Sequence, residues 1–189
     1  MRKSILLLAA TVVAMSAPAT ATSSQHRARA QVTVGGAAMY PNRTIVQNAA
    51  NSPIHTTLVA AVTAVGLVDT LSGAGPFTVF APTNAAFAKL PAGTVDTLLQ
   101  PANRAQLQAV LTYHVVAGRV TAADLMRRIR AGGGSARLTT VQGGTLTARM
   151  QGRNVILVDG RGGRARVTQA DVMQSNGVIH VTDAVSLPG

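Results

Sequence analysis

Apolar residues follow a helical spacing in the first part of the chain and a strand-like spacing in the last part. Spacing of three and four positions predicts helices with one buried face. A short apolar run at residues 77–80, between glycine-rich and proline-containing segments, predicts a buried strand. The helical pattern covers residues 45–50, 58–67, 84–90, 95–99, 107–111 and 121–129.

From Ala136 onward the period changes to two, and glycine-containing turns interrupt the alternation at near-regular intervals. Successive strands joined by short turns predict an antiparallel meander. A helical part followed by a strand-rich part predicts an α+β domain, with N-terminal helices packed on a mainly antiparallel sheet. The predicted turns are residues 142–144, 151–154, 160–163 and 175–177.

Two predicted helices begin at residues with capping side chains. We expect Asn84 to cap the helix after the first strand by accepting a hydrogen bond from the amide of Phe87. Thr121 has the same expected role for the helix that ends at the glycines 132–134.

The N-terminus has the pattern of a secretory signal peptide over residues 1–21. Arg2 and Lys3 precede an apolar run that is too short to span a bilayer, and Ala19-Thr20-Ala21 resembles a cleavage site. Residues 22–42 lack apolar periodicity and predict a flexible lead-in. We therefore expect one domain over residues 43–189, exported to a periplasm or to the medium.

Composition narrows the chemistry of this domain. The chain has 17 Lys and Arg, 6 Asp and Glu, and no cysteine, for a net charge of +11. Hydrophobic residues make up 47%, which excludes a disordered polyelectrolyte. The lack of cysteine excludes thiol catalysis and cysteine zinc sites. With only five Phe and Tyr side chains and no Trp, stacking platforms for nucleic acid are scarce, so no specific nucleic-acid partner is expected.

Three motifs resemble the signatures of the fasciclin domain family. They are residues 78–87 (TVFAPTNAAF), the pair Tyr113-His114, and residues 176–183 (NGVIHVTD) followed by Leu187-Pro188. Their order and spacing also match, over about residues 44–188. The resemblance implies a wedge of helices packed on a sheet, a secreted or surface location, an adhesion role, and no enzymatic activity.

The resemblance also implies partner-binding positions. Tyr113 and His114 match a pair within a region linked to cell adhesion in the family, although a buried, hydrogen-bonded histidine is the stronger interpretation of the sequence around them. Asp171-Val172 resembles the family's Asp-Ile integrin-contact element, with Val172 in place of Ile. A structural role for Asp171 is the alternative.

Other chemistry has little support in the sequence. No two of the four histidines have metal-ligand spacing, and no serine has the flanking glycines of a nucleophile elbow. We therefore expect no catalytic residue, metal or cofactor.

Positive charge is concentrated late in the chain, between Arg127 and Arg166, where nine arginines accompany one acid, Asp159. Guanidinium groups bind carboxylate, sulfate and phosphate with paired hydrogen bonds, which suits an anionic polysaccharide, a wall polymer or a lipid headgroup. An ordinary solvated surface is the alternative. The predicted anionic-ligand face consists of Arg149, Arg153, Arg161, Arg164 and Arg166.

A second function comes from the same resemblance, because some fasciclin-domain proteins are soluble carriers of carotenoids or similar apolar molecules. Met126, Met150 and Met173 are candidates to line an adaptable apolar groove, although they serve equally well as core residues. The sequence thus favours an exported adhesion or matrix-interaction module, with an apolar-ligand carrier as the alternative.

Overall fold

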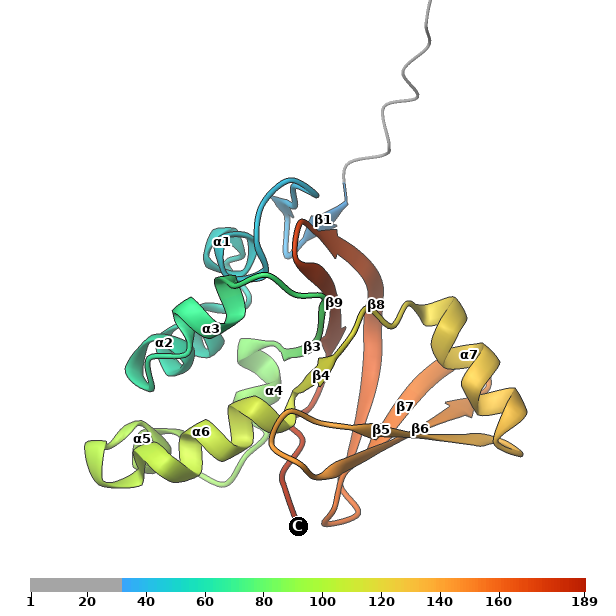
Figure 1. The fold of residues 1–189 in the computed structure, drawn as a ribbon. Coiled ribbons are helices and arrows are strands. Elements are labelled where there is room, and N and C mark those ends of the chain that lie inside the picture. Colours follow the sequence, from blue (N-terminus) through green and yellow to red (C-terminus); the bar gives the residue numbers. More distant parts are fainter. Residues whose placement is uncertain (1–31) are drawn as a thin grey trace, which may run out of the picture.

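A computed structural model describes residues 32–189, and the predicted signal peptide lies outside the described residues. Helices gather on one side of a curved sheet, and a single helix, α7, lies on the other side (Figure 1). The helices are α1 (Ile45–Asn51), α2 (Thr56–Ala64), α3 (Val68–Ser72), α4 (Asn84–Ala88), α5 (Thr94–Leu99), the 3₁₀ turn η1 (Pro101–Asn103), α6 (Arg104–Tyr113) and α7 (Ala122–Ala131).

Seven strands form the main sheet in the order β4-β3-β9-β8-β7-β6-β5. Strands β5 to β9 form the predicted antiparallel meander, whereas β3 and β9 pair in parallel. A bridge between Val116 and Thr140 links the two ends of the sheet and curls it towards closure. The strands are β3 (Phe77–Pro82), β4 (Val115–Ala117), β5 (Ser135–Thr139), β6 (Thr145–Gln151), β7 (Asn154–Val158), β8 (Arg164–Gln174) and β9 (Gly177–Thr182).

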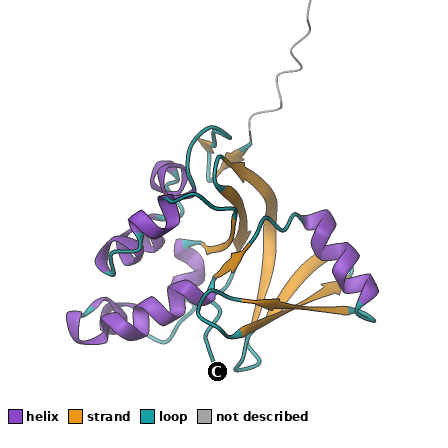
Figure 2. Cartoon of the chain, viewed as in Figure 1, coloured by secondary structure: helices purple, strands orange, loops and turns teal. Residues whose placement is uncertain are grey.

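This arrangement of helices beside a largely antiparallel sheet confirms the predicted α+β class (Figure 2). Within residues 32–189 all helices precede β5, although β3 and β4 lie between helices along the chain. Two hydrophobic cores flank the centre of the sheet. Val79 and Ile179 belong to the core under helices α1 to α6, while Phe80 belongs to the core under α7. Neighbouring residues of a strand point to opposite faces, so β3 supplies both cores.

The lead-in differs from the expectation over its last residues. Strands β1 (Thr33–Val34) and β2 (Ala37–Ala38) form a hairpin, and Val34 and Met39 are buried in the helical core. The strands are two residues long, too short for a periodic pattern to reveal them. Ordered structure therefore begins before Arg43.

The cap of α4 is also one residue away from its predicted position. Thr83, not Asn84, is the N-cap, and its hydroxyl accepts a hydrogen bond from the amide of Ala86. The Asn84 side chain instead accepts from the amide of Thr57 and donates to the carbonyl of Pro53. It thus ties α4 to the start of α2. Thr121 caps α7 as predicted, in a capping box with Asp124.

Candidate functional site

The register of the meander decides which arginines share a face. Arg149 of β6 pairs with Ile156 of β7, which pairs in turn with Arg166 of β8. Arg164 lies two residues before Arg166, and directly paired or alternate residues point to the same side of a sheet. Arg149, Arg164 and Arg166 therefore share one face, and all are exposed.

The same register adds Arg137, which the predicted face did not include. Arg137 of β5 pairs with Thr147, and Thr147 pairs with Val158, the partner of Arg164. Arg137 is one of the nine clustered arginines, and the alternation of apolar and polar residues in β5 indicates that its side chain is exposed. We call Arg137, Arg149, Arg164 and Arg166 the arginine array.

The other two predicted arginines lie at opposite ends of β7. Arg153 is in the turn before this strand and Arg161 is in the turn after it. Both are exposed, but neither belongs to the paired rows of the array. The structure therefore brings Arg149, Arg164 and Arg166 together on the strands. It places Arg153 and Arg161 in the turns at the two ends of β7.

Hydrogen bonding distinguishes the arginines further. Arg166 lies 3.5 Å from a carboxylate oxygen of Asp183, and Arg161 Nε donates to the carbonyl of Pro188 at 2.9 Å. Within residues 32–189, no ion pair or side-chain hydrogen bond involves the guanidinium groups of Arg137, Arg149, Arg153 or Arg164. These four are available to an external anion.

Tyr113 is fully buried at the end of α6 and makes two hydrogen bonds. Its hydroxyl donates to the carbonyl of Thr145 at 2.7 Å and accepts from the amide of Gly160 at 2.9 Å. Burial raises the pKa of the phenol; the Gly160 amide lowers this pKa and the charge of Asp159 raises it. The phenol joins α6 to the start of β6 and to the turn between β7 and β8, and it does not reach the surface.

His114 is 2% exposed, and both of its ring nitrogens have partners. Nδ1 donates to the carbonyl of Val110 at 2.7 Å, and Nε2 accepts from the amide of Ser186 at 3.0 Å. This pairing fits the neutral ring, and burial lowers the pKa of His114, against smaller raising effects of the Val110 carbonyl and Asp159. His114 thus attaches the C-terminal segment to α6.

Two neighbouring contacts complete the C-terminal attachment. Asp159 accepts from the amide of Leu187 at 2.8 Å, and Arg161 binds the carbonyl of Pro188, as described above. A Cβ atom placed on Gly160 would lie 2.7 Å from the backbone nitrogen of Gly189. The last residues of the chain therefore pack closely against the β7–β8 turn.

Asp171 occupies an irregular position in β8, within the register shift against β9 that falls between Gln169 and Val172. Its φ is 58°, in the left-handed region, and its carboxylate accepts a hydrogen bond from the amide of Ala122 at the start of α7. Val172 is 1% exposed and lies in the helical core. The observed contacts of both residues are internal.

Two further histidines are buried. His180 stacks on Phe80, donates from Nε2 to the carbonyl of Val120 and accepts at Nδ1 from the amide of Asp171. His55 contacts Ser52 through Nδ1, and within the described part of the chain its Nε2 makes no hydrogen bond. Burial lowers the pKa of both rings, outweighing the raising effects of the Val120 carbonyl and Asp171 on His180 and of the nearby Ala81 backbone on His55. Among the described residues, no three His, Asp or Glu side chains converge as metal ligands.

The sequence pattern of the fasciclin domain matches residues 53–188. The chain belongs to the fasciclin domain family. Protein sll1483 of Synechocystis sp. is 43% identical to it over 184 residues, which cover 97% of this chain and 95% of that protein. Immunogenic protein MPB70 of Mycobacterium bovis is 39% identical over 145 residues, 74% of this chain and 66% of that protein.

Two further comparisons concern surface proteins. Cell surface glycolipoprotein MPB83 of Mycobacterium bovis is 36% identical over 160 residues, which cover 82% of this chain and 64% of that protein. A domain pair from the insect cell adhesion molecule fasciclin I matches the structure with a TM-score of 0.68 at 19% identity, covering 76% of this chain and 50% of that chain. This structural likeness shows the fold of the domain.

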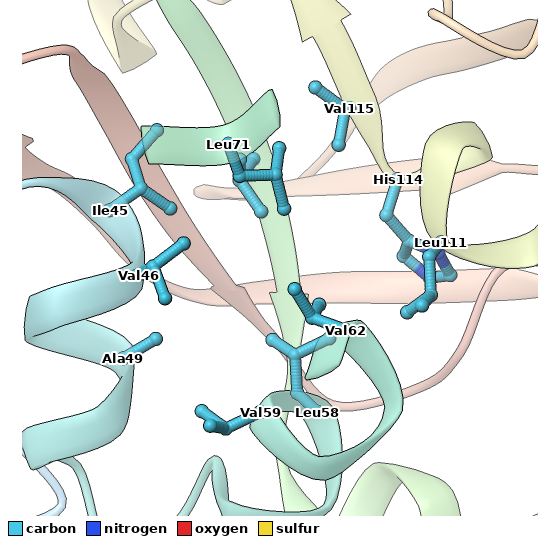
Figure 3. Close-up of a pocket in the computed structure, with 11 residues that line it drawn as sticks. Ile45, Val46, Ala49, Leu58, Val59, Val62, Leu71, Leu111, His114 and Val115 are labelled. Carbon is cyan, nitrogen blue, oxygen red and sulfur yellow. The ribbon is translucent and has the colours of Figure 1, made fainter. Parts of the chain in front are cut away.

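An apolar cavity of about 30 Å³ lies between the helices and β3 of this fasciclin domain. Figure 3 shows side chains of α1, α2, α3 and α6 around it, with His114 at one side. Ligand pockets usually measure about 300–1,000 Å³, so the observed cavity is far too small for a carotenoid. Of the three methionines considered for a groove, none lines this cavity.

No helix among residues 32–189 of the fasciclin domain is long and apolar enough to span a membrane.

Proposed function

We propose that this fasciclin domain is a non-enzymatic adhesion-type module that contacts a surface or matrix component outside the cytoplasm. The names of two similar proteins support this class, because one is a cell surface glycolipoprotein and another is a cell adhesion molecule. The signal peptide expected over residues 1–21 fits an exported protein.

The observation that carries the proposal is the exposed basic surface formed by the meander. Tyr113, His114 and Val172 are buried, so an adhesion contact through them would require the domain to open. Asp171 is part-buried, and its carboxylate already accepts a hydrogen bond from the amide of Ala122. The exposed arginines meet a partner without rearrangement, and their charge favours a carboxylate, sulfate or phosphate partner.

Binding across a salt series tests this function. The purified protein is titrated with heparin, with a bacterial wall polymer such as teichoic acid, and with phosphatidylglycerol vesicles. We expect binding to at least one of them, weakening as salt rises because exposed ion pairs are screened. Dextran, a neutral polysaccharide, is the control ligand.

A variant with all five predicted arginines changed to glutamine locates the contact. Binding should fall strongly when Arg149, Arg153, Arg161, Arg164 and Arg166 are replaced together. The proposed basic contact is wrong if the wild type binds no anionic surface. It is also wrong if the variant with five substitutions binds as well as the wild type.

A further inference from the structure

The arginine array has fixed dimensions because it is built on paired strands. Adjacent strands lie about 4.8 Å apart and alternate residues along a strand about 7 Å apart. Arg137 and Arg164 are separated by three strand spacings, so their backbone positions are about 14 Å apart. The two rows across β5, β6, β7 and β8 are Arg137, Thr147, Val158, Arg164 and Ser135, Arg149, Ile156, Arg166.

The side chain of Ile156 shows how the array is supported. It is only 8% exposed, yet it belongs to neither hydrophobic core. Its cross-strand neighbours are Arg149 and Arg166. Arginine side chains cover apolar surface with their aliphatic stems while keeping the guanidinium group in water. We infer that the two stems lie over Ile156 and hold their charged ends outward on either side of it.

We propose that the arginine array binds an extended acidic polysaccharide that runs across the strands from β5 to β8. This inference rests on the proposed function and specifies the partner and the contact. A single small anion reaches the arginines at one end of the array, whereas a chain with repeated acidic groups reaches both ends. Linking several weak contacts in one ligand raises the overall affinity.

The groups between the arginines favour a polysaccharide over a membrane. In the two rows Thr147 lies next to Arg137 and Ser135 lies next to Arg149, and their hydroxyl groups suit the hydroxyls of a sugar chain. The other two positions are taken by the part-buried Val158 and the buried Ile156. A membrane-binding surface usually adds apolar side chains that insert between lipids. The exposed large hydrophobic residues of the described chain all lie outside the two rows: Val32, Tyr40, Val141 and Met150.

The ion pair of Arg166 does not prevent this contact. The Arg166 side chain is 53% exposed and lies 3.5 Å from Asp183, which is 28% exposed. Solvent-exposed ion pairs contribute little to stability, so an acidic ligand competes readily for this guanidinium group. The remaining three arginines of the array have no such competitor among the described residues.

A pair of matched variants tests the array. The first carries Arg137→Gln, Arg149→Gln and Arg164→Gln. The control carries Arg119→Gln, Arg128→Gln and Arg130→Gln, which are exposed and lie outside the array. Both remove three positive charges, so a general loss of electrostatic attraction affects them equally. Circular dichroism and thermal unfolding check that both remain folded.

The ligands are heparin fragments of increasing length, from disaccharide to decasaccharide, together with inorganic sulfate and phosphatidylglycerol vesicles. Affinity should rise steeply with fragment length and be weak for sulfate. The array variant should bind the decasaccharide about 30-fold more weakly, or about threefold for each lost exposed contact. The control variant should lose much less.

The outcomes separate this inference from the proposed function. Equal losses in the two variants, or a disaccharide that binds as tightly as a decasaccharide, would overturn the array while leaving a basic contact in place. Binding to vesicles without binding to heparin would replace the polysaccharide with a membrane surface. Failure to bind any anionic ligand would overturn both proposals.

Discussion

Strands β9 and β6 belong to one sheet but have opposite environments. All six residues of β9 are buried, whereas β6 alternates between buried and exposed positions along its first half. β9 lies between two hydrophobic cores, and β6 has one face on a core and the other towards solvent. The difference shows that both faces of the central strands are covered, whereas α7 covers only one face of the meander and leaves the other face free.

Polar groups behave differently in the two regions. In the covered region most of them are paired internally: Thr78 donates to the carbonyl of Gly118 and accepts from the amide of Val120, and His180 bonds to backbone at both nitrogens. Nε2 of His55 is the exception among the described residues. A buried polar group without a partner is costly, so these side chains serve the fold. On the open face, guanidinium groups remain free to bind another molecule.

Two adjacent residues of β7 give the largest expected contrast. Leu157 is fully buried under α7, while Ile156 faces the open side. Leu157→Ala should lower the free energy of unfolding by about 3–5 kcal/mol because it leaves a cavity in a core. Ile156→Ala should cost about 1–2 kcal/mol, because this side chain belongs to neither hydrophobic core and its cross-strand neighbours are arginines. Urea unfolding measures both, and equal losses would show that the outer face is packed like a core.

Asp171 marks the bulge in β8 between the open and the covered parts of the sheet. Asp171→Ala should cost about 2 kcal/mol, since it removes the acceptor for the first amide of α7 and places alanine in the left-handed region. Asp171→Asn keeps an acceptor and tolerates this conformation, so it should cost less than about 1 kcal/mol. If alanine and asparagine are equally destabilising, the carboxylate charge, not the hydrogen bond or the backbone conformation, dominates.

Acid should destabilise the domain through the histidines buried in its covered region. Burial lowers the pKa of His55, His114 and His180, so the unfolded chain takes up protons at a higher pH than the folded protein does. The free energy of unfolding should therefore fall as the pH drops below about 6.5, by up to about 1.4 kcal/mol per pH unit for each histidine.

Urea unfolding between pH 8 and pH 5 measures this dependence. His114→Gln should lower stability at every pH and also reduce the slope with pH, because the substituted side chain does not titrate. A slope that is unchanged in the His114, His55 and His180 variants would show that other groups cause the acid sensitivity.

The elements of the fold follow from local patterns, but their long-range pairing does not. The change of period from helical to strand-like predicts the helices and the meander, and the glycine-containing turns separate the strands. The parallel pairing of β3 with β9 joins residues 77–82 to residues 177–182, and no local pattern specifies it. No local pattern predicts the hairpin of β1 and β2 either, because this hairpin is held in place by the burial of Val34 and Met39 against the helices.

The candidate site, too, is predicted in part by local sequence pattern and in part only by strand pairing. Clustering of arginine in the sequence identifies the basic region, and the alternation within strands identifies exposed positions. Membership of the array depends on register, which adds Arg137 and separates Arg153 and Arg161 from the others. Thr83 and Asn84 both have side chains that can cap α4. Thr83 is the cap because the side chain of Asn84 is engaged by the start of α2.

The packing of Gly189 against Gly160 has a practical consequence for handling the protein. A purification tag, fluorophore or surface linker fused to the C-terminus would begin beside the turn that carries Arg161, near the meander. Figure 1 places β1 at the other end of the molecule from this terminus. Immobilisation through the N-terminal side would therefore present the arginine array to a ligand in solution, whereas a C-terminal linker would crowd it.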